Sequence, residues 1–204
     1  KCFCMGLIKT FEGLDQRRPK HSTTETVSYL LMGTILILFI PFILELLTTK
    51  KIIGSGAVFY VPGEFGLSTM AILASTWVYA FARRCKEADK QVYLKYALST
   101  MLGLGVLFLF LQVQGWQHIF LDSKAQNVKI LLVLVVVHGF HFLIALGLVI
   151  SLLIKLKSIR SAADNYIFFL NPKHNMFFIT AGRYWDFLGF LWMGLYILML
   201  LKTV

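Results

Sequence analysis

The 25 residues from Ile130 to Ile154 read ILLVLVVVHGFHFLIALGLVISLLI, and this stretch decides the fold class. It lies between Lys129 and Lys155, and every residue in it is apolar, glycine or serine except His138 and His141. About 20 apolar residues are enough for a helix to cross the roughly 30 Å hydrocarbon core of a bilayer. The stretch therefore predicts a transmembrane helix with two polar rings near its middle.

The composition of the whole chain places the other helices in a membrane as well. Hydrophobic residues make up 58% of its 204 residues and charged residues only 15%, whereas soluble domains have about 25% charged residues. We therefore predict an all-α integral membrane bundle of five transmembrane helices in a single domain, residues 27–204, after a polar and basic N-terminal segment, residues 1–26. The predicted spans are Val27–Leu47, Phe65–Ala82, Tyr96–Gln114, Ile130–Ile154 and Tyr184–Leu201.

The positive charges lie mainly on one side of the predicted bundle. The net charge is +10, and Lys and Arg total 20. Most of them fall on the side of the N-terminus, which the positive-inside rule makes cytoplasmic, so the C-terminus is predicted to lie outside. This placement explains the net charge without nucleic acid as a partner. The opposite side receives only Lys50, Lys51, Lys124, Lys129 and Lys202.

His138 and His141 lie three residues apart and therefore share one helix face. A polar ring in hydrocarbon is costly without a partner. The remaining histidines, at positions 21, 118 and 174, lie at predicted helix ends or in loops, which excludes haem held between two histidines of this chain. Two interpretations stay open. His138 or His141 is a single axial ligand in a haem b electron-transfer subunit, or both rings form hydrogen bonds to adjacent helices as polar packing elements.

Acidic residues do not form a path through the predicted membrane region. Glu45 comes late in the first predicted span, near Lys50. Asp186 is predicted at the cytoplasmic start of the last span, three residues after Arg183, where an ion pair or the helix N-terminal charge accounts for it. A self-contained pump or antiporter is therefore not expected, because proton relays use chains of buried acids.

Small and polar residues within the spans predict close contacts between helices. Gln112 is expected to form hydrogen bonds across helices. Trp116 and Trp185 are predicted to lie in the aromatic belts at the membrane surfaces. The sequence contains no motif typical of a catalytic site or a metal cluster, so we predict no catalytic, cofactor or metal residues in this chain. Close helix approach is predicted at Gly103, Gly105, Gly115, Gly139 and Gly147.

Four of the predicted spans, in order, carry motifs of one known family. Residues 67–75 read LSTMAILAS, residues 104–112 read LGVLFLFLQ with Trp116 four positions on, and residues 138–141 read HGFH. The last motif consists of His174, Phe178, Ala181, Tyr184, Trp185, Phe187 and Trp192. Together the motifs resemble subunit III of the haem–copper oxygen reductases, which are the cytochrome c and quinol oxidases, over residues 65–196.

This chain departs from the family pattern at three positions. Residues 33–36 read GTIL where many members carry an acidic residue, Gly115 replaces a glutamate, and Asp186 replaces a histidine. The roles attached to those positions are therefore not carried over. The five-helix count resembles the shorter form of the family and implies the bacterial cytoplasmic (inner) membrane.

The resemblance implies a subunit without an active site of its own. Haem and copper are expected in partner subunits, and the expected partners are oxidase subunit I, other oxidase subunits and a respiratory supercomplex. Such a subunit packs on subunit I, holds phospholipid, and supports proton uptake and sustained oxygen reduction. The family pattern also places Lys155 and His174 near a lipid headgroup. Anionic lipid on a positively charged cytoplasmic side fits that role, and ordinary juxtamembrane charge is the alternative.

Overall fold

A computed structural model describes residues 23–48, 61–122, 126–159 and 161–203. These ranges consist of helices and short connections without any strand, so the all-α class is confirmed. Residues 1–22, most of the predicted N-terminal segment, lie outside the described residues. The helices are α2 (Thr23–Thr48), α3 (Gly63–Glu87), α4 (Gln91–Asp122), α5 (Gln126–Lys157), α6 (Ala162–Leu170) and α7 (Pro172–Thr203).

Four of the described helices are long and apolar enough to cross a membrane. They are α3, α4, α5 and α7, and their candidate spans run from 25 to 30 residues. The chain is therefore a multi-pass membrane protein. In α2, the described apolar stretch is the shorter Ser28–Pro41, so the fifth span remains a prediction.

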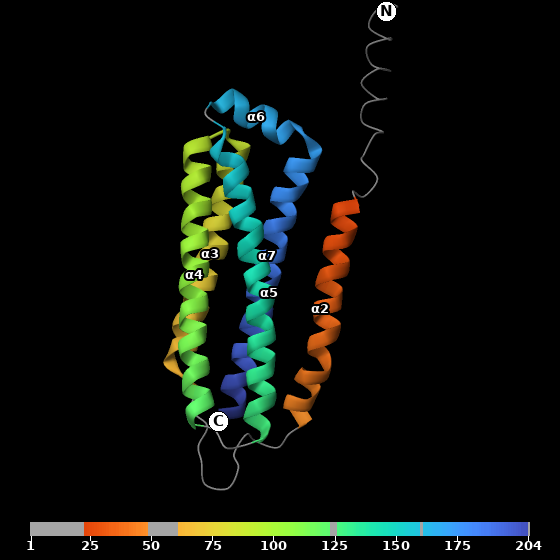
Figure 1. Cartoon of the computed structure of the whole chain (residues 1–204), viewed down its shortest axis with the longest axis vertical. Helices are drawn as coiled ribbons and strands as arrows, with labels where there is room; N and C mark the ends of the chain where they lie inside the picture. The colour runs from red at the N-terminus through yellow and green to blue at the C-terminus, as the bar shows by residue number, and fades with distance from the viewer. Residues whose placement is uncertain (1–22, 49–60, 123–125, 160, 204) are drawn as a thin grey trace, which may run out of the picture.

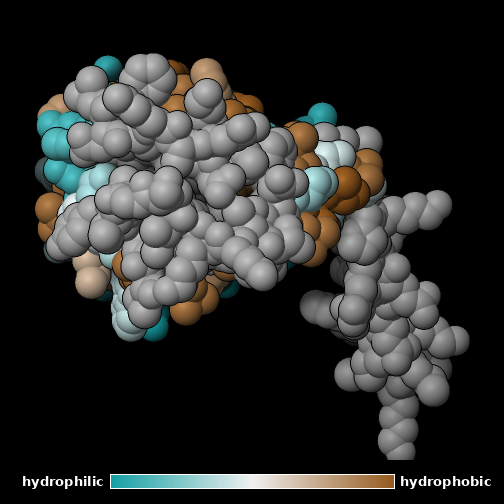
Figure 2. Space-filling model, turned by 90° about the horizontal axis from the view of Figure 1, so that it is seen from below, coloured by the Kyte–Doolittle hydropathy of each residue, from teal (hydrophilic) through white to brown (hydrophobic). Residues whose placement is uncertain are grey.

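The four spanning helices pack into a bundle in which α3 contacts α4 and α7, and α5 contacts α4 and α7. Helix α2 lies on the outside of this bundle, against α5 and α7 (Figure 1). The long helices alternate in direction, and the short α6 lies across one end, which we call the α6 end (Figure 1). Seen from the opposite end, hydrophobic residues appear on several sides of the outer flank (Figure 2). Several polar residues of the spans are buried in the interior, among them Ser68, Ser75 and Gln112.

The last helix begins twelve residues earlier than predicted, at Pro172 instead of Tyr184. Asn171 precedes it, and its Oδ1 accepts a hydrogen bond of 3.0 Å from the backbone N–H of Lys173. Asparagine is a preferred N-cap residue, and proline is favoured at the first helical position. The chain between the predicted spans Ile130–Ile154 and Tyr184–Leu201 therefore contains α6 and the first turns of α7.

This earlier start changes the position of two charged residues. Asp186 lies roughly 20 Å from the first residue of α7, given a rise of about 1.5 Å per residue. The predicted helix N-terminal effect on Asp186 is therefore wrong. Arg183 also lies inside α7 instead of in a loop, and its guanidinium donates a 2.7 Å hydrogen bond to the Tyr29 hydroxyl of α2.

Glycines allow close helix contacts, although not at all of the predicted positions. A Cβ at Gly105 would lie 2.4 Å from the Trp185 ring, and one at Gly139 would lie 2.7 Å from the Trp116 ring. At Gly115 the nearest atom, on the Phe65 ring, would lie 2.6 Å away. These three predictions are confirmed. The predictions for Gly103 and Gly147 are wrong for the described part of the chain, where a Cβ at either position would meet no atom within 4 Å.

Trp185 does not lie in an aromatic belt at the membrane surface. Its side chain is 0% exposed, and its ring lies 4.8 Å from the ring of Phe142, centroid to centroid. The prediction is wrong because Gly105 leaves room for the indole between α4, α5 and α7. The ring is therefore part of the bundle interior, where the candidate site is found.

Candidate functional site

A row of hydrogen bonds joins α3 to α7 through the interior of the bundle. Each bond links a side chain that is buried between the two helices to a partner on the other helix. Because α3 and α7 are antiparallel, the α3 partners ascend in number as the α7 partners descend. The bonds run from Trp192 Nε1 to Thr69 Oγ1 (3.0 Å), from Trp185 Nε1 to Ser75 Oγ (2.9 Å) and from the Tyr79 hydroxyl to the Phe178 carbonyl (3.3 Å).

The serine and threonine hydroxyl groups of α3 are suited to accept hydrogen bonds from neighbouring helices. Each one donates its own hydrogen to a carbonyl oxygen of the preceding turn, as hydroxyls inside helices commonly do. Ser68 and Thr69 donate to the carbonyl of Phe65, and Ser75 donates to the carbonyl of Ile72. Because the hydrogen is used within the helix, the oxygen lone pairs remain available to donors on neighbouring helices.

Gln112 connects α4 to the same region of α3. Its Nε2 donates a 2.9 Å hydrogen bond to Ser68 Oγ, and both side chains are buried. The predicted hydrogen bond of Gln112 across helices is therefore confirmed. The other amide atom, Oε1, is buried without a hydrogen-bond partner in the part of the chain that the structure describes.

His138 lies in the centre of the bundle and is only 1% exposed. Among the described residues, neither of its ring nitrogens has a hydrogen-bond partner. Its ring instead packs against aromatic rings of three other helices, with centroid distances of 5.6 Å to Trp192, 6.3 Å to Phe108 and 6.4 Å to Phe39. The expected hydrogen bond from this ring to an adjacent helix is therefore wrong for the described residues, and aromatic packing takes its place.

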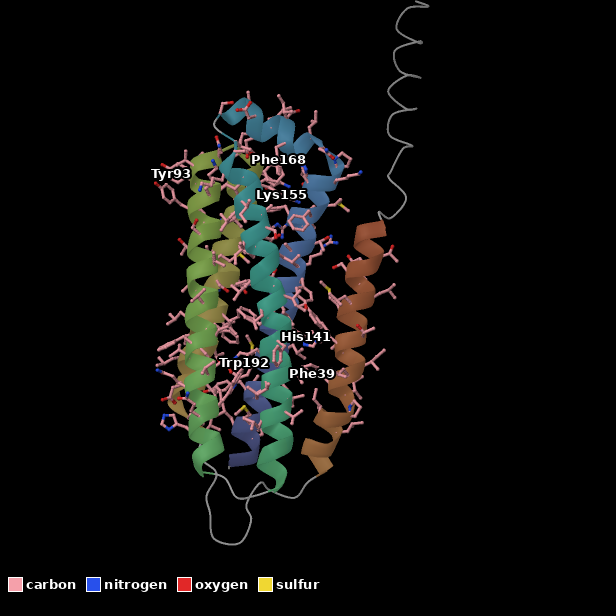
Figure 3. The ribbon with its side chains drawn as sticks, in the orientation of Figure 1. Phe39, Tyr93, His141, Lys155, Phe168 and Trp192 are labelled. Atoms are coloured by element: carbon pink, nitrogen blue, oxygen red, sulfur yellow. The ribbon has the colours of Figure 1, made fainter. Side chains whose placement is uncertain are left out.

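His141 is half-buried on the side of α5 that faces α2 (Figure 3). Its Nδ1 lies 2.8 Å from the carbonyl oxygen of Val137, one turn earlier in α5. A carbonyl can only accept, so Nδ1 carries the hydrogen and, in the neutral ring, the lone pair is on Nε2. The bond therefore lies within α5 and not between helices, while the ring itself packs 6.4 Å from that of Phe39 on α2.

The accessibility of the ring nitrogens decides whether His138 or His141 fits the role of a haem ligand. An axial ligand must present a ring nitrogen to the iron at the open face of a pocket. Both nitrogens of His138 are covered by the surrounding aromatic rings, so His138 does not fit this role. His141 retains Nε2, with Nδ1–H held by a carbonyl as in many metal-binding histidines. Within the described ranges, no group of three or more His, Cys, Asp or Glu residues is arranged to hold a metal ion.

Lys155 lies near the α6 end of α5, close to Phe168 of α6 (Figure 3). His174 lies in the first turn of α7, which directly follows α6. The Lys155 ammonium lies 4.3 Å from the centroid of the Phe177 ring, which is one turn beyond His174 on α7. The His174 ring stacks on that of Phe168 from α6 at 4.0 Å, and its Nδ1 lies 3.2 Å from the Phe168 carbonyl oxygen. The fold thus brings the two predicted lipid-binding residues to the same corner of the bundle.

Asp186, one of the two acidic residues singled out by the sequence, does not form a hydrogen bond of this interior row. Asp186 is half-buried and lines a cavity of about 190 Å³ between α3 and α7, together with Thr76, Trp77 and Phe190. The side chain of Glu45 lies outside the described part of the structure. Among the described residues, the fully buried polar side chains therefore carry hydroxyl, amide, imidazole and indole groups within an otherwise apolar interior.

The fold and this interior define a multi-pass, all-helical membrane protein whose spanning helices are joined by buried polar and aromatic contacts. No family model matches the chain, and no curated protein matches it.

Proposed function

We propose that the chain is a non-catalytic subunit III of a haem–copper terminal oxidase in a bacterial cytoplasmic membrane. In this proposal it crosses the membrane five times, with its N-terminus in the cytoplasm and its C-terminus outside. It packs on subunit I, holds phospholipid and supports proton uptake during aerobic respiration. Haem and copper belong to the partner subunits.

The observation that carries the proposal is that residues from separate family-like motifs contact one another. Ser68, from the LSTMAILAS motif, accepts a bond from Gln112, which ends the LGVLFLFLQ motif. Thr69, from the first motif, accepts a bond from Trp192 in the last one. His138, from the HGFH motif, packs on the same Trp192 ring. The four motifs thus form one packing unit, which supports a shared origin of the pattern over chance similarity in apolar helices.

Two features of the charge and surface agree with a subunit of a larger membrane complex. Around the described spans, Lys and Arg gather at the α6 end, which fits a cytoplasmic position for that end. The outward faces of the helices carry large apolar side chains such as Met70, Phe110 and Phe140, each at least 59% exposed. Such faces can meet either lipid or the helices of partner subunits.

Purification from native membranes in mild detergent tests the proposal. An affinity-tagged chain should co-purify with a protein that has the haem and copper spectra of an oxidase, in equal amounts. Once separated from that partner, the chain should show no Soret band. Equal recovery of an unrelated membrane complex, without oxidase spectra, would contradict the proposal.

His141 supports a second candidate function, a haem b electron-transfer subunit. The supporting observation is the Nδ1 contact with Val137, which leaves Nε2 available as a ligand. In this case a Soret band should persist in the separated chain and disappear in His141→Leu, while His138→Leu should keep it. The same purification therefore separates the two functions.

The proposed lipid role of Lys155 and His174 predicts a loss of bound anionic phospholipid. The variant Lys155→Ala with His174→Ala should retain about fivefold less of this lipid, because one cation near an anionic surface, here Lys155, contributes about 1 kcal/mol. Native mass spectrometry of the detergent-purified chain measures it. The control Lys157→Ala with Lys173→Ala changes two exposed cations at the same end. Equal losses in the two variants would show ordinary juxtamembrane charge instead of a site.

A further inference from the structure

A second pocket lies at the α6 end, where α3 turns into α4. Its volume is about 260 Å³, and it is lined by Phe81, Arg84, Cys85, Ala88, Lys90 and Tyr93. Phe81, Arg84 and Cys85 recur at helical spacing and so share one face of the last two turns of α3, and Ala88 is the residue that caps this helix. Lys90 and Tyr93 close the pocket from the turn and from the start of α4. In Figure 3 Tyr93 lies on the flank of the bundle away from Lys155, so this pocket is separate from the Lys155 and His174 corner.

The residues that line the pocket change from apolar to charged along the membrane normal. Helix α3 runs toward the α6 end, so Phe81 lies about one turn deeper in the membrane than Arg84. Phe81 and Tyr93 are 51% and 59% exposed. Lys90 follows the end of α3, beyond Arg84. The site therefore has the Phe81 ring at acyl-chain depth, and Tyr93 and the two cations nearer to the level of the membrane surface.

The two cations form no direct ion pair with the nearby acids among the described residues. Arg84 and Lys90 are exposed, and neither forms an ion pair within the described residues. Glu87 and Asp89 belong to the same turn but do not line the pocket. Asp89 has a φ of 52°, and the backbone N–H of Lys90 donates to the Cys85 carbonyl at 2.9 Å. This turn holds Lys90 over the end of α3, beside Arg84.

We propose that this pocket binds the headgroup of an anionic phospholipid. The phosphate would lie between Arg84 and Lys90, and the acyl chains would run along Phe81 into the membrane. A volume of about 260 Å³ is below the usual range for whole drug-sized ligands, which begins at about 300 Å³, and it suits a headgroup whose chains lie outside. Arginine forms paired hydrogen bonds with phosphate oxygens, and basic clusters beside the cytoplasmic ends of spanning helices attract anionic lipid. The proposal does not depend on membership of an oxidase.

Native mass spectrometry of the delipidated full chain, titrated with phosphatidylglycerol or with phosphatidylcholine of the same acyl chains, tests the site. The wild-type chain should prefer phosphatidylglycerol. The variant Arg84→Gln with Lys90→Gln should bind it about thirtyfold more weakly at one site, since each cation contributes a factor of about five. The matched control is Arg83→Gln with Lys157→Gln, which removes two exposed cations from the same end but leaves the pocket intact.

The control should keep wild-type affinity at this site. Equal weakening of the control, or equal binding of the two lipids by the wild-type chain, would overturn the proposal. A further arm adds inorganic phosphate at millimolar concentration. Phosphatidylglycerol should remain bound, whereas its complete displacement would mean that the pocket takes a free anion and not a lipid. A loss of bound phosphatidylglycerol in Lys155→Ala with His174→Ala, but not in Arg84→Gln with Lys90→Gln, would support the Lys155 and His174 site and overturn this one. The two lipid proposals can therefore fail separately.

Discussion

Gly182→Ala should lower the stability of the chain by about 3 kcal/mol, the upper end of the range for added bulk in a packed interior. A Cβ at this position would lie 1.7 Å from Cζ of the Tyr79 ring. The ring has little freedom to move away, because Tyr79 is 5% exposed, its hydroxyl donates to the Phe178 carbonyl, and its ring packs 5.6 Å from that of Phe178. Helices α3 and α7 must therefore separate to admit one methyl group. Thermal unfolding of the purified chain in detergent measures the loss.

Gly194→Ala is the matched control, since it adds the same methyl group to the same helix where a Cβ would meet nothing within 4 Å. It should be neutral, or slightly stabilising because alanine favours helix over glycine by up to about 1 kcal/mol. Combining Gly182→Ala with Tyr79→Ala should cost less than the two single changes added together, because the small side chain removes the clash. Equal effects of Gly182→Ala and Gly194→Ala would contradict this account of the α3–α7 contact.

The glycines also show how far the sequence alone could lead. Periodicity and hydropathy were enough to predict the helical class and each long helix, because a membrane span needs only length and apolar character. They could not show which glycines are in close contacts. That depends on the partner residue, and Tyr79 is far from Gly182 in the sequence. Gly182 was missed for this reason, while Gly103 and Gly147 were predicted and meet nothing.

The start of α7 and the position of Trp185 also differ between the sequence-based prediction and the structure. Hydropathy places the start of the last span at Tyr184, whereas Asn171 followed by Pro172 is typical of a helix start twelve residues earlier. That second interpretation would have placed Asp186 and Arg183 inside α7. Trp185 was assigned to the membrane surface because tryptophan is enriched there. Its burial could be predicted only by pairing it with the Ser75 hydroxyl, which lies on another helix.

The candidate site was predicted in part. Gln112 was identified correctly as a residue that bonds across helices. For His138 and His141, polar character suggested hydrogen bonds to other helices, whereas the structure surrounds His138 with aromatic rings. Sequence reasoning expected a buried histidine to require a polar partner. It could not anticipate that rings from α2, α4 and α7 meet at this point.

Trp192→Ala should lower the stability of the chain at least as much as Gly182→Ala, because it leaves a cavity where the other variant introduces a clash. The Trp192 side chain is 0% exposed and its ring lies 5.6 Å from the rings of Phe65, Phe108 and His138. Removal of a large buried aromatic side chain costs about 3–5 kcal/mol, because the surrounding groups cannot close the cavity. Here the loss also removes the hydrogen bond to Thr69 and one of the rings that cover His138. Unfolding of the purified chain in detergent should show a fall of this size.

Two variants separate packing from hydrogen bonding at this position. Trp192→Phe keeps an aromatic ring but loses the indole N–H, worth about 0.6 to 1.7 kcal/mol between membrane helices. It also loses part of the buried ring volume, so it should cost more than the hydrogen bond alone but less than Trp192→Ala. Trp77→Ala removes the same side chain from α3 where it is 78% exposed, and it should leave stability nearly unchanged. If Trp192→Phe were as destabilising as Trp192→Ala, the hydrogen bond to Thr69 would dominate. The intermediate cost that we expect would instead show that ring packing around His138 is the main force that joins α3, α4, α5 and α7.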